Sequence, residues 1–179
     1  RVEPQHPGNV GAVARVMVNF GIDELALVKG CEIDDDGYAR SKSGRPILEN
    51  LSRFDTLEEA LADCDVTIAT SGIKPEGDKR WFRAPKGMNE LPELVKEREK
   101  PALVFGRENY GLYREELALC EVTITIPTNP EYPILNLSHA VGIVLYEIYR
   151  HKDHKNPKKR KAVSNDEFER LVDRIMDLL

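Results

Sequence analysis

The chain has 179 residues, a net charge of −5, and a composition that is 41% hydrophobic and 32% charged. This length suits one ordinary domain with a short appendage, and the hydrophobic share is enough for a buried core. No apolar run reaches the roughly 18 residues of a membrane span, and the opening Arg-Val-Glu-Pro lacks the apolar centre of a signal peptide. We therefore expect neither a membrane protein nor a secreted one.

The cysteines and histidines exclude an obvious metal centre. Cys31, Cys64 and Cys120 are widely spaced and odd in number, so we expect them to be reduced and buried, as in a cytoplasmic protein. The four histidines show no metal-binding spacing with carboxylates or thiols. No metal is expected.

The elements are predicted from hydrophobic periodicity, helix caps and strand propensity. In chain order we predict the end of a strand at 2–4, a helix over 9–20, a strand over 24–28, a polar loop over 34–43, a helix over 57–62, a strand over 65–70, a long loop over 73–90, a helix over 91–98, a strand over 102–105, a helix over 113–119, a strand over 121–126 and a helix over 137–150.

This alternation of short apolar strands with helices predicts an α/β fold, a parallel sheet with helices on both faces. In such sheets ligands bind outside the carboxyl ends of the strands. The loops at those ends carry the most unusual sequences of the chain, namely PQHPGN, TSG, GRENYG and PTNPEYPILN.

The C-terminal part differs from the rest. Residues 151–161 contain six Lys or Arg and one Asp, a net +5 that leaves −10 on the remainder. Such basic arms often contact polyanions, although a solvated linker is the alternative. Ser164 and Glu167 then form a capping box, and apolar residues follow at helical spacing. We expect a helix over 164–179 that packs on a further helical domain or on a partner chain.

The first strand-end loop contains candidate functional residues. Gly11 and Arg15 are four residues apart and share a helix face, so the glycine would leave room for a ligand beside the guanidinium. Asn9 stands at the expected N-cap, where backbone N–H groups can bind an anion. A salt-bridged, structural Arg15 is the alternative. The sequence has no Walker phosphate loop, dinucleotide fingerprint or nucleophile elbow.

Three stretches together resemble the ordered motifs of the SPOUT-class RNA 2′-O-ribose methyltransferases, and most of all the TrmJ type of tRNA methyltransferase. They are EPQHPGNVGAVARVMVNFG (3–21), LVFGRENYGL (103–112) and IPTNPEYPILNLSHAVGIVLYE (126–147). The resemblance implies a methyltransferase domain over 1–150 with a trefoil knot at its C-terminal side. It also implies a basic linker over 151–163, the start of a helical extension at 164–179, a homodimer, and S-adenosylmethionine as cofactor.

The resemblance further implies methylation of the ribose 2′-OH of cytidine or uridine at position 32 of the tRNA anticodon loop. It assigns Arg15 and Asn9 to catalysis. The resemblance implies that Arg15 acts as the base for the 2′-OH. Because arginine is almost never neutral in a protein, the alternative is a guanidinium that orients the 2′-oxygen and stabilises its developing charge. Either role predicts that Arg15 is essential.

The remaining site residues follow from the same motifs. The implied cofactor pocket consists of Thr70, Ser71, Gly72, Gly106, Ile126, Pro133, Ile134 and Leu135. The family often has small polar residues where this chain has Pro133 and Ile134. The expected RNA-binding and supporting residues are Arg80, Trp81, Arg83, Lys86, Arg107, Glu108, Asn136, Lys158, Lys159 and Arg160. Aromatic and cationic side chains of this kind stack on bases and pair with phosphates.

Residues 127–136 are a long connection for a strand and a helix, with three prolines in ten residues. The resemblance implies that they form the knot loop around the cofactor, stiffened by proline. Internal ion pairs are the alternative for Arg107 and Glu108, and a loop anchor for Trp81. Alternatives for the whole chain are a related enzyme with another tRNA or rRNA target, a non-catalytic RNA-binding module on the same fold, and, less well supported, a nucleotide-cofactor oxidoreductase.

Overall fold

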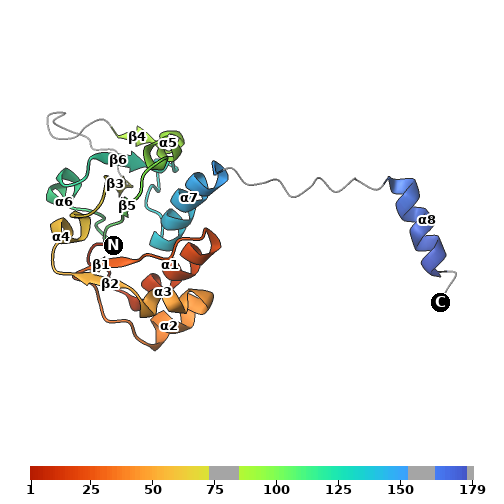
Figure 1. Cartoon of the computed structure of the whole chain (residues 1–179), viewed down its shortest axis with the longest axis horizontal. Helices are drawn as coiled ribbons and strands as arrows, with labels where there is room; N and C mark the ends of the chain where they lie inside the picture. The colour runs from red at the N-terminus through yellow and green to blue at the C-terminus, as the bar shows by residue number, and fades with distance from the viewer. Residues whose placement is uncertain (73–84, 153–163, 177–179) are drawn as a thin grey trace.

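The computed structural model of the chain describes residues 1–72, 85–152 and 164–176 (Figure 1). Its helices are α1 (Pro7–Asn19), α2 (Asp35–Ser41), α3 (Arg45–Glu49), α4 (Leu57–Leu61), α5 (Leu91–Val95), α6 (Arg114–Ala118), α7 (Leu137–Arg150) and α8 (Asn165–Met176). Its strands are β1 (Ala26–Val28), β2 (Ser52–Phe54), β3 (Val66–Ser71), β4 (Lys86–Gly87), β5 (Pro101–Val104) and β6 (Val122–Thr125). Two 3-10 turns, η1 (Lys42–Gly44) and η2 (Met88–Glu90), join some of these elements.

The described strands pair in parallel, in the orders β1-β2 and β4-β6-β3-β5. The first residues of the chain connect the two groups. Val2 forms a parallel bridge with Val28 and donates its N–H to the carbonyl of Phe105 at 2.9 Å. The predicted strand end at residues 2–4 is therefore confirmed, and it lies between β5 and β1.

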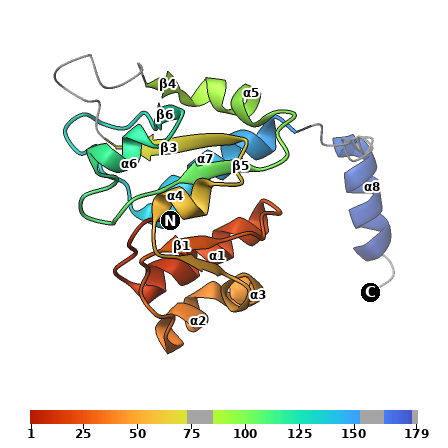
Figure 2. The same cartoon turned by 60° about the vertical axis from the view of Figure 1, so that its left-hand side comes forward.

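Helices cover both faces of the sheet, as predicted. Adjacent strand residues point to opposite faces, and Leu27 and Val28 accordingly belong to two separate apolar clusters. Leu27 belongs to the cluster that contains the buried residues of α1, α5 and α7, whereas Val28 belongs to the cluster that contains Leu57 of α4. Figures 1 and 2 show α1 and α7 on one side of the strands and α4 on the other.

The predicted helix at 137–150 has the observed bounds of α7, and the structure shows why it begins there. The side-chain oxygen of Asn136 accepts a hydrogen bond from the backbone N–H of Ser138 at 3.0 Å. This bond satisfies one of the donors that every helix leaves unpaired at its first turn. Asn136, expected among the RNA-binding and supporting residues, therefore also caps this helix.

The prediction of a polar loop over 34–43 is wrong, because α2 occupies most of it. Asp34 accepts a hydrogen bond from the backbone N–H of Gly37 at 2.9 Å and so caps the helix. Acidic residues in the first turn and Arg40 in the last complement the helix dipole. The prediction also missed α3 and β2, and it placed in a loop the short elements β4 and η2.

The helix predicted over 164–179 is confirmed as α8 within the described residues. Val172, Ile175 and Met176 are exposed on it, and its role as a C-terminal extension stays a prediction. The three cysteines are free thiols, but each is half-buried rather than buried. In the described parts of the chain, none of the helices combines the length and the apolar character that crossing a membrane requires.

Candidate active site

The start of α1 places Asn9 differently from the prediction. His6 is the N-cap residue and makes no side-chain cap hydrogen bond, while Pro7 occupies the first helical position, where its missing N–H costs nothing. Asn9 therefore lies inside the first turn rather than at the N-cap. Its side-chain amide donates to Oε1 of Glu108 at 3.0 Å, so the amide binds a carboxylate and not the helix terminus.

Glu108 is the centre of a half-buried polar cluster. It accepts hydrogen bonds from Asn9 and, at 3.3 Å, from the backbone N–H of Gln5, and it forms an ion pair with the buried guanidinium of Arg1 at 2.5 Å. Burial alone would raise the pKa of Glu108, but the hydrogen bonds from Asn9 and Arg1 and the charge of Arg1 outweigh it and lower this pKa to about 2. Glu108 is therefore an ionised acceptor at neutral pH.

Arg15 lies on the exposed surface of α1 and makes no hydrogen bond or ion pair with the part of the chain that the structure describes. The alternative in which Arg15 has a structural role in a salt bridge is therefore not observed among the described residues. The prediction that Gly11 leaves room for a ligand is wrong. A Cβ at Gly11 would collide with the backbone carbonyl of Gly37, because α1 and α2 pack backbone to backbone at this point.

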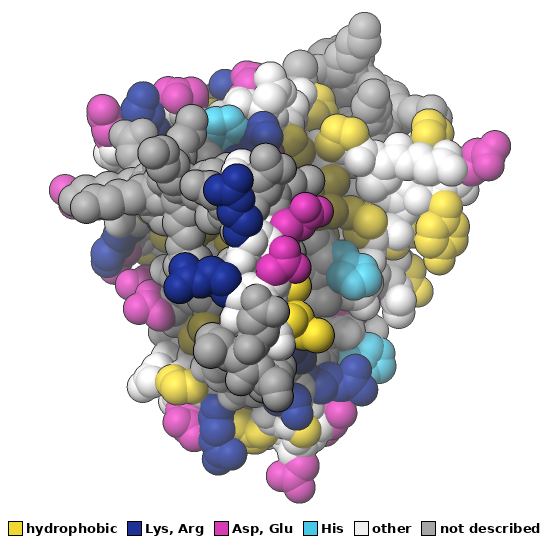
Figure 3. Space-filling view, turned by 90° about the vertical axis from the view of Figure 1, so that its right-hand side faces the viewer, with side chains coloured by type: hydrophobic (Ala, Val, Ile, Leu, Met, Phe, Trp, Pro, Cys, Tyr) yellow, Lys and Arg dark blue, Asp and Glu magenta, His cyan; other side chains and the backbone are white. Residues whose placement is uncertain are grey.

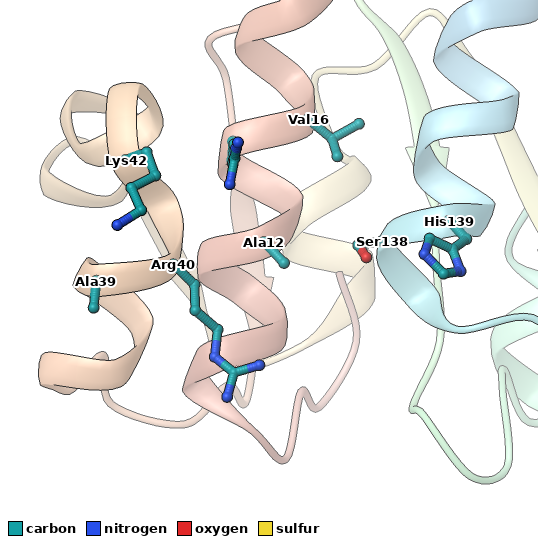
Figure 4. A pocket seen from close by; sticks show the side chains of 8 residues that line it. Ala12, Val16, Ala39, Arg40, Lys42, Ser138 and His139 are labelled. Carbon is teal, nitrogen blue, oxygen red and sulfur yellow. The ribbon is translucent and has the colours of Figure 1, made fainter.

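A cavity of about 560 Å³ opens on the other side of Arg15 (Figure 4). Figure 4 shows α1 in its middle, α2 on one side and the start of α7 on the other. Figure 3 views the molecule from the side of Figure 1 on which α7 lies, and Lys, Arg and His side chains are visible there among Asp and Glu side chains. The residues that line the cavity are Ala12, Arg15, Val16, Ala39, Arg40, Lys42, Ser138 and His139.

The sequence analysis assigned no role in the site to Arg40, Lys42, Ser138 or His139. The first two were assigned to a loop because the helix signal of Asp34 was overlooked. Ser138 and His139 lie two and three residues after the cap residue Asn136, in the first turn of α7, and this cap was the available signal for them.

The strand-end loops of the expected cofactor pocket come together at one edge of the sheet. Ser71 at the end of β3 pairs with Thr125 at the end of β6, and the hydroxyl of Thr70 donates to the carbonyl of Val104 in β5 at 3.0 Å. A Cβ at Gly72 would lie 3.8 Å from the carbonyl oxygen of Pro133. Three neighbouring strands and the proline loop are therefore adjacent, as the fold class predicts.

The expected pocket and its neighbourhood contain an unpaired hydroxyl and apolar side chains. The hydroxyl of Thr125 is buried and has no hydrogen-bond partner among the described residues, and the sequence analysis did not single it out. Ile126, the next residue in the chain, is buried, whereas Ile134 in the proline loop is 54% exposed. The hydroxyl of Thr128 donates to the carbonyl of Pro133 at 3.1 Å and holds that loop.

Gly106 has a structural reason for being a glycine. A Cβ there would collide with the backbone of Gly111, which exchanges two backbone hydrogen bonds of 3.0 Å with Arg107. These bonds close a tight loop that carries Glu108 at its start and turns through the positive φ of Gly111. The loop therefore holds Glu108 in a defined position beneath α1.

Arg107 is buried and makes internal ion pairs, so its side chain is not exposed as a direct RNA contact would be, and a supporting role in the site stays a prediction. Its side chain is 4% exposed, forms two hydrogen bonds of 2.8 and 2.9 Å with Glu116, and forms a third with Glu3 at 2.9 Å. Its guanidinium also stacks on the ring of Tyr113. The Glu116 hydrogen bonds raise the pKa of Arg107 further above its ordinary value, despite burial. The internal ion pair, considered as the alternative, is what the structure contains.

The other expected RNA contacts are only partly described. Lys86 is half-buried at β4 and lies 3.5 Å from Glu90 in an ion pair. Arg80, Trp81, Arg83, Lys158, Lys159 and Arg160 lie outside the described residues. In the described ranges there is also no group of three or more His, Cys, Asp or Glu side chains that would hold a metal.

Residues 1–146 match the model of the SpoU rRNA Methylase family. The chain belongs to the SpoU methylase family. Two similar proteins are both named tRNA (cytidine-2′-O-)-methyltransferase TrmJ. The one from Methanocaldococcus jannaschii is 44% identical over 84% of this chain and 66% of its own length. The one from Sulfolobus acidocaldarius is 40% identical over 99% of this chain and 75% of its own length.

A solved structure extends the match to the fold of this SpoU methylase. The probable methylase family protein from Haemophilus influenzae superposes with a TM-score of 0.78 at 33% identity, over 98% of this chain and 75% of that one. The chain thus spans about two thirds to three quarters of these relatives. The α/β class and the family predicted from the three motifs are confirmed.

Proposed function

We propose that this chain is the catalytic domain of an S-adenosylmethionine-dependent tRNA ribose 2′-O-methyltransferase that acts on cytidine or uridine at position 32 of the anticodon loop. Two relatives, 44% and 40% identical, have names that specify 2′-O-methylation of cytidine in tRNA. The observation that carries the proposal is the hydrogen bond between Asn9 of the first motif and Glu108 of the second. The proline loop of the third motif lies beside Gly72, at the end of the neighbouring strand β3.

The proposed cofactor-binding residues lie at three strand ends, those of β3, β5 and β6. Thr70–Gly72, Gly106, Ile126 and Pro133–Leu135 would surround S-adenosylmethionine, with the unpaired hydroxyl of Thr125 as a polar contact that we add to this set. When bound, the cofactor supplies a methyl group that the adjacent positive sulfur makes electrophilic. The protein then has to align the ribose oxygen with that methyl group and exclude water.

Asn9 is suited to orient the ribose hydroxyl. The carboxylate of Glu108 is ionised and can only accept hydrogen bonds, so it binds the NH₂ group of Asn9 and fixes the orientation of the amide. The amide oxygen of Asn9 then remains as an acceptor that points away from Glu108. A ribose 2′-OH that donates to this oxygen would present its lone pairs to the methyl group.

Arg15 provides the positive charge. Its guanidinium is exposed at the cavity and unpaired within the described residues, so a ligand does not have to displace a carboxylate. A hydrogen bond from Arg15 to the 2′-oxygen, or to the phosphate beside it, would stabilise the negative charge that develops as the hydroxyl loses its proton.

The trefoil knot, the homodimer and a cytoplasmic location belong to the same proposal. The proline loop leads from β6 into α7, where the family resemblance implies the knot. For the dimer, the exposed apolar residues Val18 of α1 and Ile143 and Tyr146 of α7 are the supporting observation, since exposed apolar patches mark interaction surfaces. Light scattering of the wild type and of Ile143→Glu tests the dimer.

The function is tested with a tRNA transcript that has cytidine at position 32. After incubation with S-adenosylmethionine, mass spectrometry of the digested nucleosides should show 2′-O-methylcytidine, and a transcript with 2′-deoxycytidine at position 32 should show none. Arg15→Ala should lose at least about 100-fold in rate, whereas Arg45→Ala, which removes another exposed arginine outside the cavity, should not.

Cofactor binding without methylation of this tRNA would point to another RNA target. A folded protein that binds RNA but no cofactor would be the non-catalytic module.

A further inference from the structure

The cavity beside Arg15 contains two cations that the proposed chemistry does not use. Arg40 at the end of α2 and Lys42 in η1 line the cavity together with Arg15, and none of the eight described lining residues is acidic. We propose that Arg40 and Lys42 form a phosphate-binding subsite for the RNA backbone next to the ribose at Arg15. This inference rests on the proposed function in taking RNA as the ligand.

The position of Lys42 relative to Arg15 is set by backbone contact. Gly44, at the end of the same turn, packs directly on α1, and a Cβ there would lie only 2.7 Å from the backbone nitrogen of Arg15. Since real Cβ atoms do not approach this closely, only glycine allows the turn to lie against α1 in this way. The turn is thereby held next to the base of the Arg15 side chain.

Lys42 has an unfavourable backbone conformation. Its φ of 49° and ψ of −117° are those of the first central residue of a type II′ turn, a position dominated by glycine. A lysine therefore adds strain at this position, and strain of this kind is concentrated at functional sites. Lys42 also makes no ion pair with the described residues. A structural ion pair therefore does not explain why a lysine occupies this strained position.

Arg40 is prepared for a bidentate contact. Only its Nε is engaged, in a 2.9 Å hydrogen bond to Asp36, while its two terminal nitrogens have no partner among the described residues. A guanidinium with two adjacent N–H groups available matches the oxygens of a phosphate. The carboxylate of Asp36 holds Arg40 by its Nε but does not line the cavity.

The opposite wall of the cavity also favours an anion. Ser138 and His139 belong to the first turn of α7, a helix of 14 residues whose N-terminus carries the positive end of its dipole. Figure 4 shows these residues across α1 from Arg40 and Lys42. Cations on one side, a helix N-terminus on the other and Arg15 between them are arranged to bind a phosphodiester backbone that crosses the cavity.

The test is tRNA binding as a function of salt, measured by fluorescence anisotropy on the whole chain without cofactor. Arg40→Gln and Lys42→Gln should each weaken binding by roughly tenfold and lower the log–log salt slope by about one.

Arg45→Gln is the matched control. Arg45 is also exposed and also paired through Nε with a carboxylate four residues away, Glu49 at 2.8 Å, but it does not line the cavity. This control should bind within about twofold of the wild type.

A second variant separates charge from folding. Lys42→Gly relieves the backbone strain, so its melting temperature should not fall, yet its tRNA binding should weaken as in Lys42→Gln. Cofactor affinity by calorimetry should stay unchanged in all these variants. The inference would be overturned if Arg40→Gln and Lys42→Gln kept the wild-type salt slope. It would also be overturned if they lost no more tRNA affinity than Arg45→Gln.

The two proposals fail in different ways. If the double variant Arg40→Gln, Lys42→Gln methylates tRNA with an unchanged KM, the subsite is wrong and the methyltransferase function stands. If the wild type binds RNA with a salt slope that depends on Arg40 and Lys42 but methylates no ribose, the subsite is supported and the proposed function fails.

Discussion

Asn9 and Glu108 are 99 positions apart in the chain, and their side chains meet in a 3.0 Å hydrogen bond. This bond connects the first turn of α1 to the loop after β5, so it joins two of the three motifs that the sequence presents separately. It also decides which atom of Asn9 is offered to a ligand, because an ionised carboxylate accepts only from the NH₂ group.

Replacing Glu108 by glutamine should therefore disturb catalysis more than cofactor binding. The glutamine can donate as well as accept, so the amide of Asn9 is no longer held in one orientation. We expect kcat to fall by roughly 10- to 100-fold, in the range of a lost positioning hydrogen bond, with little change in S-adenosylmethionine affinity by calorimetry. Asn109→Ala, a change at the exposed neighbour, is the control and should keep near wild-type kcat.

The low pKa of Glu108 predicts how stability depends on pH. The folded-state value of about 2 is below the ordinary value of 4.5. The ionised carboxylate therefore stabilises the fold above about pH 4.5, and this stabilisation is lost as the pH falls towards 2. Urea unfolding between pH 6 and pH 2 should show a smaller loss of stability for Glu108→Gln than for the wild type. Parallel curves would contradict this assignment.

Two glycines should respond in opposite ways to alanine. At Gly106 the added Cβ meets the backbone of Gly111 and Leu112, so Gly106→Ala should destabilise the fold by about 1–3 kcal/mol or more. At Gly142, inside α7, the nearest atom is a side-chain carbon of Val16 at an ordinary 3.6 Å, and alanine should stabilise by about 0.5–1 kcal/mol through its helix propensity. Thermal or urea unfolding of both variants checks the contrast.

Arg107 should matter for stability rather than for RNA binding. Arg107→Lys keeps the charge but cannot reproduce the two parallel hydrogen bonds to Glu116 or the stacking on Tyr113. We expect a loss of about 1–3 kcal/mol in the free energy of unfolding, with the salt dependence of tRNA binding unchanged. A folded, stable Arg107→Lys protein with a reduced salt slope would restore Arg107 to the RNA-binding surface.

Local signals in the sequence were sufficient for much of the fold. The 3.6-residue periodicity that begins after Asn136 gave the bounds of α7 correctly, and the β-branched run near Val66 gave β3. The same kind of signal was present at Asp34, where a cap and acidic first-turn residues mark α2, but the polar composition of the segment was given more weight. Short elements such as β2 and β4 have too few residues to show a period.

The sequence by itself determined the α/β class, the helices on both faces and the loops that carry the motifs, because periodicity, caps and turn residues are properties of neighbouring positions. Only the tertiary structure decided which side chains meet. It placed Asn9 on Glu108, buried Arg107 between Glu3 and Glu116, filled the space beside Gly11 with α2, and opened the cavity that Arg15 shares with Arg40 and Lys42. These contacts depend on the order β4-β6-β3-β5 and on the close approach of α1 to α2. Both bring together residues that are distant in the chain, and such contacts produce no periodic pattern in the sequence.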